Sequence, residues 1–221
     1  MKSIVRVILP VMPVVVCLAG CLSKPAEIAV QMLPMKVETR FIEKLKPGEK
    51  SPLSADQEAL TDWQFGCKTA FDFEIVEKSE LADEFLVNVK IKKATISLDA
   101  PVTIWISSKA SEDTKIHEEA HVLICRRVYS EAEQTVLSGA RRVIKKEFQG
   151  GGSTLEAAVK DGLSRASEEI CRYYHMAMVE KINRVSEIFD TLDHDNPDKK
   201  DSELVELAFQ KYRLIKGNKS E

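Results

Sequence analysis

The middle of the chain alternates apolar and polar residues in the way that is typical of β-strands. Apolar residues occupy every second position over residues 71–75, and the alternation returns over residues 86–98. A third short apolar run, residues 102–107, follows a proline. The charged stretch EKSELADE separates the first two runs as a turn. This pattern predicts two or three antiparallel strands.

Beyond the strands the apolar period changes to that of a helix. Apolar residues recur three or four positions apart over residues 112–148, and the QGGGS stretch at residues 149–153 interrupts the pattern. Ser153 and Glu156 then have the spacing of a capping box, which opens a second helix ending near Leu192. Two long helices joined by a short loop fold back on each other. The predicted fold class is therefore α+β, with a small antiparallel sheet packed on a long antiparallel helical hairpin.

The first twenty residues have the pattern of a processing signal. Two basic residues precede an apolar run that is too short to span a bilayer as a helix, so residues 1–20 are predicted to be a signal peptide. The run ends in Leu-Ala-Gly-Cys, which resembles the lipobox of bacterial lipoproteins. That resemblance implies lipidation of Cys21. With Leu22 rather than Asp after it, the resemblance implies anchoring at the periplasmic face of the outer membrane.

The segment after the predicted anchor contains four prolines and no sustained period, so residues 21–60 are interpreted as lipid anchor and tether, with some local structure in the stretch VETRFIEKL. Residues 196–221 are interpreted as a polar helical C-terminal tail. The formal net charge of −3 and the lack of a basic stripe argue against a nucleic-acid partner.

The sequence HEEAH lies on the first predicted helix. Residues four apart on a helix project from one face, so His117 and His121 can bind one zinc ion. Glu118 between them has the position of the general base in HExxH metalloproteases. Glu119 is a charged residue at a position that is usually uncharged, and we expect it to face solvent or Lys115.

A catalytic zinc needs a third protein ligand, and the predicted hairpin restricts where it can lie. A turn centred near residue 151 places residues 181–185 opposite the two histidines, with a tolerance of about one turn or more. The ligand types within that tolerance are, in chain order, His175, Glu180, Glu187, Asp190 and His194.

Three cysteines follow the lipidation site, and an exported protein is expected to form one disulfide. Cys171 can pair with Cys125, which would set His121 beside His175, or with Cys67, which would join the second helix to the sheet. Both pairings stay open here, and Cys67 with Cys171 is the candidate disulfide. Cys125 is interpreted as a small buried residue.

The order of these segments resembles a bacterial family of unknown function described as predicted secreted zinc-dependent proteases. The matching stretches are FLVNVKIKKATISL, HEEAHVLICRRV, EEICRYY and IFDTLDHD. The resemblance covers roughly residues 60 to 195, and it implies a zincin-like metallopeptidase domain over residues 61–195. It implies Asp190 as the first candidate for the third ligand and His194 as the second, before Glu187 and His175. It also implies that an edge strand pairs with the substrate, a role open to residues 102–107.

The sequence therefore predicts an envelope-anchored zinc metallopeptidase. Zinc is the expected cofactor, and the expected partners are a membrane, through the lipid on Cys21, and a peptide or protein substrate. The alternative is a non-catalytic envelope lipoprotein whose helical hairpin is a structural or interaction module.

Overall fold

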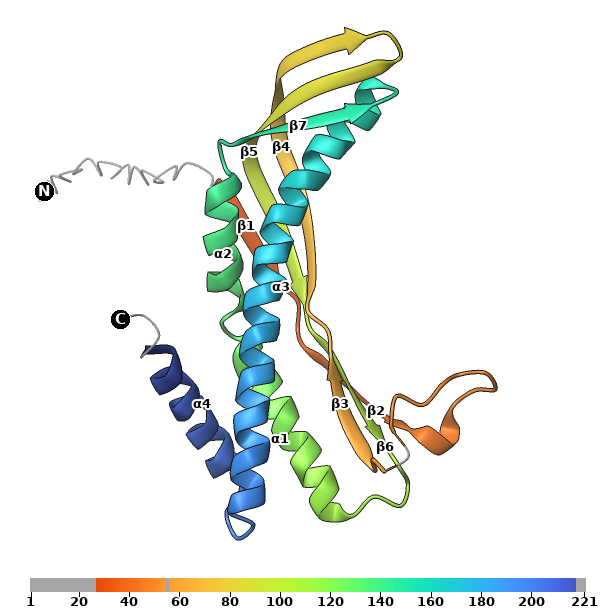
Figure 1. Ribbon diagram of the computed structural model, residues 1–221, viewed down its shortest axis with the longest axis vertical. Coiled ribbons are helices and arrows are strands. Elements are labelled where there is room, and N and C mark those ends of the chain that lie inside the picture. The colour runs from red at the N-terminus through yellow and green to blue at the C-terminus, as the bar shows by residue number, and fades with distance from the viewer. Residues whose placement is uncertain (1–26, 55, 218–221) are drawn as a thin grey trace, which may run out of the picture.

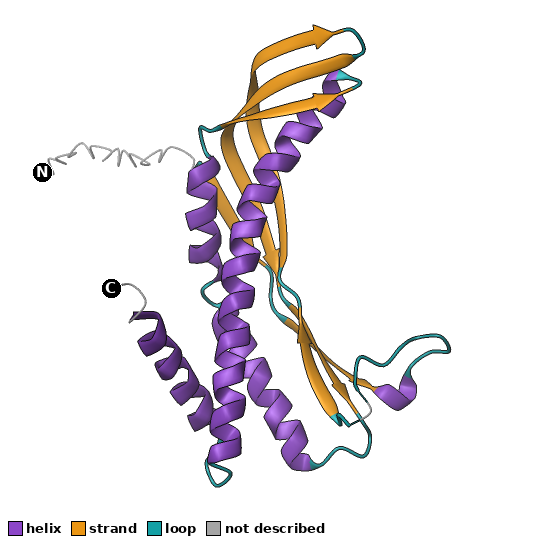
Figure 2. Cartoon of the chain, in the orientation of Figure 1, coloured by secondary structure: helices purple, strands orange, loops and turns teal. Residues whose placement is uncertain are grey.

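The computed structural model describes residues 27–54 and 56–217, and it is elongated along a single long helix (Figure 1). The predicted signal peptide and Cys21 lie outside these residues. Helices form one layer and strands the other (Figure 2). The elements, in chain order, are β1 (Ile28–Met32), β2 (Lys36–Phe41), the short 3-10 helix η1 (Ile42–Lys44), β3 (Ala59–Trp63), β4 (Gly66–Leu81), β5 (Glu84–Asp99), β6 (Pro101–Ile106), α1 (Glu112–Tyr129), α2 (Ala132–Val143), β7 (Glu147–Gly152), α3 (Leu155–Asp195) and α4 (Asp201–Gly217).

The protein is of the α+β class, but its strands form two mixed sheets rather than one antiparallel sheet. The larger sheet has the order β1-β5-β4, with β7 also paired to β5, and the smaller has the order β2-β6-β3. The pairs β1–β5 and β2–β6 are parallel, and the other pairs are antiparallel. The three predicted strand regions correspond to β4, β5 and β6.

The interpretation of residues 21–60 as a tether is wrong for the part that forms β1 and β2. Backbone hydrogen bonds pair β1 with the longer strand β5 and β2 with the more buried strand β6. All six residues of β2 are exposed, so the strand has no buried face, although its sequence KVETRF does alternate uncharged and charged residues.

The predicted loop at residues 149–153 is also wrong, because this stretch lies in and just after β7, which pairs with β5. The first predicted helix is correspondingly shorter and is divided into α1 and α2. Glycine is needed in β7 because α3 begins directly against it. A Cβ atom on Gly150 would lie 2.0 Å from the carbonyl oxygen of Ala158 and 2.4 Å from the nitrogen of Gly162.

The long helix α3 begins one residue later than the predicted capping box implies. Thr154, rather than Ser153, is the N-cap, and its hydroxyl accepts a hydrogen bond from the backbone nitrogen of Ala157 at 3.1 Å. The helix then continues for 41 residues. Its N-terminal part packs on the larger sheet, and its C-terminal part lies beside α1 and α4 (Figure 1).

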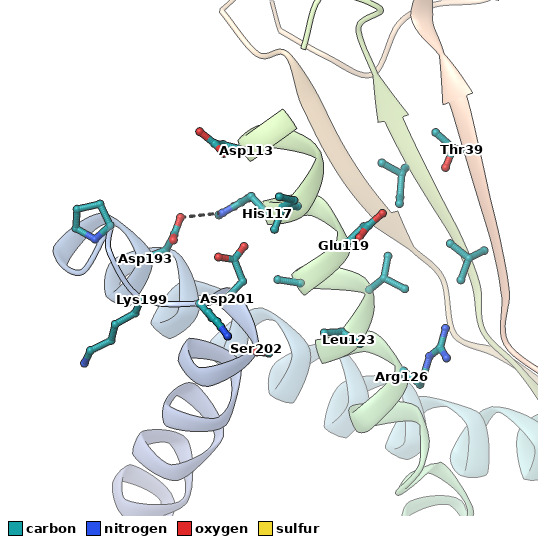
Figure 3. A pocket seen from close by; sticks show the side chains of 17 residues that line it. Thr39, Asp113, His117, Glu119, Leu123, Arg126, Asp193, Lys199, Asp201 and Ser202 are labelled. Atoms are coloured by element: carbon teal, nitrogen blue, oxygen red, sulfur yellow. Dashed lines mark hydrogen bonds and ion pairs between the residues drawn. The ribbon is translucent and has the colours of Figure 1, made fainter. Parts of the chain in front are cut away.

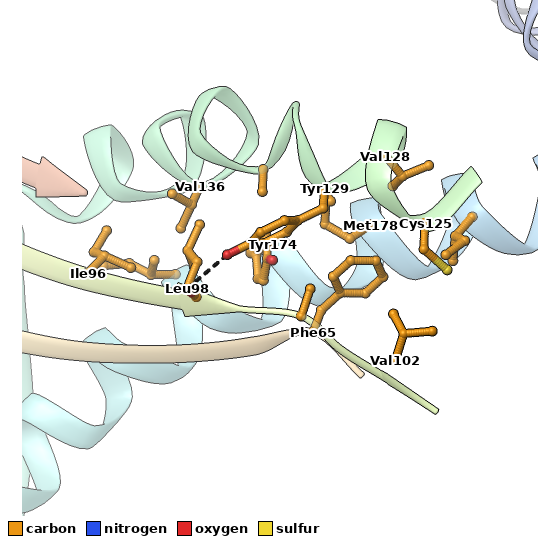
Figure 4. Packing of buried hydrophobic residues seen from close by; sticks show 14 of the residues in the cluster. Phe65, Ile96, Leu98, Val102, Cys125, Val128, Tyr129, Val136, Tyr174 and Met178 are labelled. Atoms are coloured by element: carbon orange, nitrogen blue, oxygen red, sulfur yellow. Dashed lines mark hydrogen bonds between the residues drawn. The ribbon is translucent and has the colours of Figure 1, made fainter. Parts of the chain in front are cut away.

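The core lies between the strands and the helices: α2 and α3 cover the larger sheet, α1 packs on the smaller sheet, and α4 adds apolar residues from beside α3 (Figure 4). Tyr174 is fully buried, and the Tyr129 hydroxyl donates to the carbonyl oxygens of Leu33 and Leu98 at 2.8 and 3.0 Å. A disulfide between Cys67 and Cys171 joins β4 to α3. The candidate disulfide is therefore present, and it fixes the middle of α3 against the sheet.

The C-terminal segment is helical, as predicted, but it is more than a polar tail. One face of α4 is buried and packs on α3, including Leu204, Ala208 and Phe209. No helix in residues 27–54 or 56–217 has both the length and the apolar character needed to cross a membrane.

Candidate metal centre

The two histidines of HEEAH lie one turn apart on α1 and project toward α3. Ser111 caps α1, where its hydroxyl accepts a hydrogen bond from the backbone nitrogen of Thr114 at 3.0 Å. The Nε2 atoms of His117 and His121 are 3.2 Å apart. Both rings also contact Phe189 of α3, with ring centroids 5.1 and 5.3 Å away. The predicted convergence of the two imidazoles is present.

Asp190 of α3 completes a group of three potential ligands. Its Oδ1 atom lies 3.1 Å from Nε2 of His121 and 3.6 Å from Nε2 of His117. Ligand atoms about 2.0–2.1 Å from a tetrahedral zinc are about 3.3 Å apart. The three observed separations of 3.1, 3.2 and 3.6 Å bracket that value. The geometry and the donor types therefore fit a zinc ion with one open position.

A second carboxylate binds the other side of the His117 ring. Oδ2 of Asp193 lies 3.0 Å from Nδ1 of His117 (Figure 3). His117, Asp193 and Asp201 form a second group whose ligand atoms lie within 4.8 Å of one another. Burial, followed by the negative charge of Asp193, raises the pKa of Asp201. Asp193 was not singled out from the sequence, although it lies one helical turn beyond Asp190.

The other candidates for the third ligand lie elsewhere. His194 is exposed and belongs to neither metal-competent group among the described residues. Glu187 pairs with Arg184 at 2.8 Å. Nε2 of His175 lies 2.5 Å from the backbone oxygen of Phe65. Asp190 is therefore the candidate that the fold brings to the histidines.

Glu118 lies on the side of α1 that faces the smaller sheet. The residue is 7% exposed, and the Thr61 hydroxyl of β3 donates to its Oε2 atom at 2.6 Å. The same hydroxyl lies 3.2 Å from the backbone oxygen of Glu118. Glu118 belongs to neither metal-competent group, so its carboxylate is held by the sheet rather than by the histidines. Glu119 is exposed, as expected.

An open groove of about 910 Å³ runs along the outer face of α1 (Figure 3). His117, Asp193 and Asp201 lie along its wall, and Ile116 and Leu123, each 45% exposed, provide apolar surface. Residues of β2, β6 and the turn before α4 complete it. A ligand in this groove would therefore contact His117.

The strand expected to pair with a substrate cannot do so. Residues 102–107 contain most of β6, which is bonded on one side to β2 and on the other to β3. Its backbone groups are therefore already used within the sheet. Among the described strands of the smaller sheet, β2 and β3 are the two edges.

Comparison of the chain with protein-family models, with curated proteins and with solved structures found no match in any of the three.

Proposed function

We propose that this protein is a zinc metallopeptidase. The observation that carries the proposal is the convergence of two imidazole nitrogens and one carboxylate oxygen at separations of 3.1–3.6 Å. Two nitrogens and one oxygen around an open fourth position are a ligand set of catalytic zinc. In this proposal α1 and α3 are the two arms of the zinc-binding helical pair.

His117, His121 and Asp190 would hold the zinc, which when bound lowers the pKa of a coordinated water and polarises a carbonyl group. Glu118 is proposed as the general base. It follows His117 directly in α1, and among the described residues the Thr61 hydroxyl bonds one of its two carboxylate oxygens, Oε2. The other oxygen, Oε1, would receive the proton of the attacking water and deliver it to the leaving amine.

The groove along α1 is the proposed binding site of the peptide or protein substrate, because His117 lies in its wall. We also propose that the protein is held at the periplasmic face of the outer membrane by a lipid on Cys21. The Cys67–Cys171 disulfide agrees with export to an oxidising compartment.

The zinc content of the purified protein tests the first half of the proposal. We expect one zinc per chain by elemental analysis, and loss of that zinc in His121→Ala. Glu187→Ala is a matched control, because Glu187 is on α3 but pairs with Arg184. A wild-type protein without stoichiometric zinc would refute the proposal.

Hydrolysis of a fluorogenic peptide library tests the second half. Glu118→Gln should keep its zinc and lose at least about 100-fold in kcat/KM, the contribution expected of a general base. Glu119→Gln, the exposed neighbour, should retain activity. Zinc binding without hydrolysis would instead identify an interaction module with a structural metal.

A further inference from the structure

His117 faces a different carboxylate with each of its two ring nitrogens. Nε2 lies 3.6 Å from Asp190 and 3.2 Å from Nε2 of His121, whereas Nδ1 lies 3.0 Å from Asp193. A neutral imidazole has one N–H group and one lone pair, so only one of the two nitrogens can bind a metal. The two metal-competent groups, which share this residue, therefore compete for a single imidazole.

The hydrogen bond to Asp193 determines which nitrogen of His117 is free to bind a metal. A carboxylate accepts the hydrogen bond, so the proton of His117 belongs on Nδ1 and the lone pair on Nε2. That lone pair points to the group that contains His121, where a second imidazole provides the nitrogen ligand that zinc favours. The other group would need the proton removed from Nδ1, and it offers two carboxylates and no further nitrogen.

The two histidines also differ in how their rings are held. The side chain of His121 is 11% exposed, and its Nδ1 atom has no hydrogen-bond partner among the described residues, so burial rather than a polar contact at Nδ1 holds its ring. The side chain of His117 is 29% exposed and lies at the open groove. The more accessible ring needs the polar contact to keep its orientation.

We infer that Asp193 is a positioning residue of the metal centre, which fixes the tautomer and the ring orientation of His117 and does not itself bind the metal. The inference rests on the proposed function, since it requires zinc at Nε2 of His117. A carboxylate that accepts the outer N–H of a zinc ligand typically changes metal affinity by about 10- to 100-fold.

Zinc affinity of the full chain, measured by competition with a chromophoric chelator, tests this inference. Asp193→Ala should weaken zinc binding by about 10- to 100-fold. Asp193→Asn keeps a neutral hydrogen-bond acceptor, so its zinc affinity should lie between those of Asp193→Ala and the wild type. Asp195→Asn is the matched control. It removes the same charge from an exposed position two residues further along α3, so its affinity should equal that of the wild type.

Nitrogen-15 NMR of the histidine rings provides a readout that a merely structural role would not change. In the zinc-free protein the wild type should show His117 as the single Nδ1–H tautomer, and Asp193→Ala should show a mixture of tautomers; the wild type should bind one zinc per chain. Unchanged affinity in Asp193→Ala, an Nε2–H tautomer, or two zinc ions per chain would overturn the inference while leaving a zinc centre in place. A wild type that binds no zinc would overturn the proposed function and this inference together.

Discussion

Reducing the Cys67–Cys171 disulfide should lower the free energy of unfolding by an amount that the loop length sets. The two cysteines are 104 residues apart, so the bond restricts almost half of the 221-residue chain when it is unfolded. The loop-entropy relation for that length gives about 4.7 kcal/mol at 25 °C. This is a large share of the about 5–15 kcal/mol that typically stabilises a folded domain.

Urea unfolding followed by circular dichroism, with and without a phosphine reductant, measures this effect. The unfolding midpoint should fall on reduction by about 4.7 kcal/mol divided by the measured m-value. A Cys67→Ala/Cys171→Ala double variant should begin at the lower midpoint and should not respond to the reductant.

Cys125→Ala is the control, because it leaves the disulfide intact and should still respond to reduction. A decrease of less than about 1 kcal/mol in the free energy of unfolding on reduction would refute the reasoning. Opening a loop of this length should restore more conformational entropy than that to the unfolded chain.

Three further predictions test packing and burial. Gly150→Ala should destabilise the protein by at least about 2 kcal/mol in urea unfolding, because its Cβ would meet the backbone of α3; Gly217→Ala, with open space around it, should not destabilise it. Burial raises the pKa of the Cys125 thiol to about 12, so a disulfide reagent at pH 8 should react with it only after denaturation, and rapid reaction of the native protein would contradict its burial. Leu204→Ala should cost about 2–5 kcal/mol because Leu204 is fully buried, whereas Leu214→Ala, at a position 68% exposed, should stay within about 0.5 kcal/mol; equal effects would mean that α4 does not pack on α3.

The part of the site that follows helical geometry was predictable from the sequence. The four-residue spacing of His117 and His121 places them on one face of any helix. Hairpin geometry left five candidates for the third ligand, and the family resemblance put Asp190 first among them. Asp193 was not predicted because a metal-binding motif specifies the groups that bind the metal and not the carboxylate that accepts a hydrogen bond from one of those groups. An acid one turn beyond Asp190 was the available signal.

The strands of the N-terminal segment were not predictable in the same way. The exposed strand β2 is held by backbone hydrogen bonds to β6, and its short KVETRF alternation buries no face, which makes it a weak signal among the prolines of this segment. Glycine was misleading in β7. A run of glycines usually breaks secondary structure, but here the lack of side chains lets a strand lie directly against a helix.

The unbroken length of α3 links the proposed metal centre to the larger sheet far from it. From Cys171 to Asp190 the helix rises about 28 Å, at about 1.5 Å per residue. With the disulfide as a pivot, a tilt of only about 2° would move Asp190 by about 1 Å, whereas metal–ligand distances tolerate only about 0.2 Å. The position of Asp190 relative to His117 and His121 therefore depends on how the other end of α3 packs against the larger sheet.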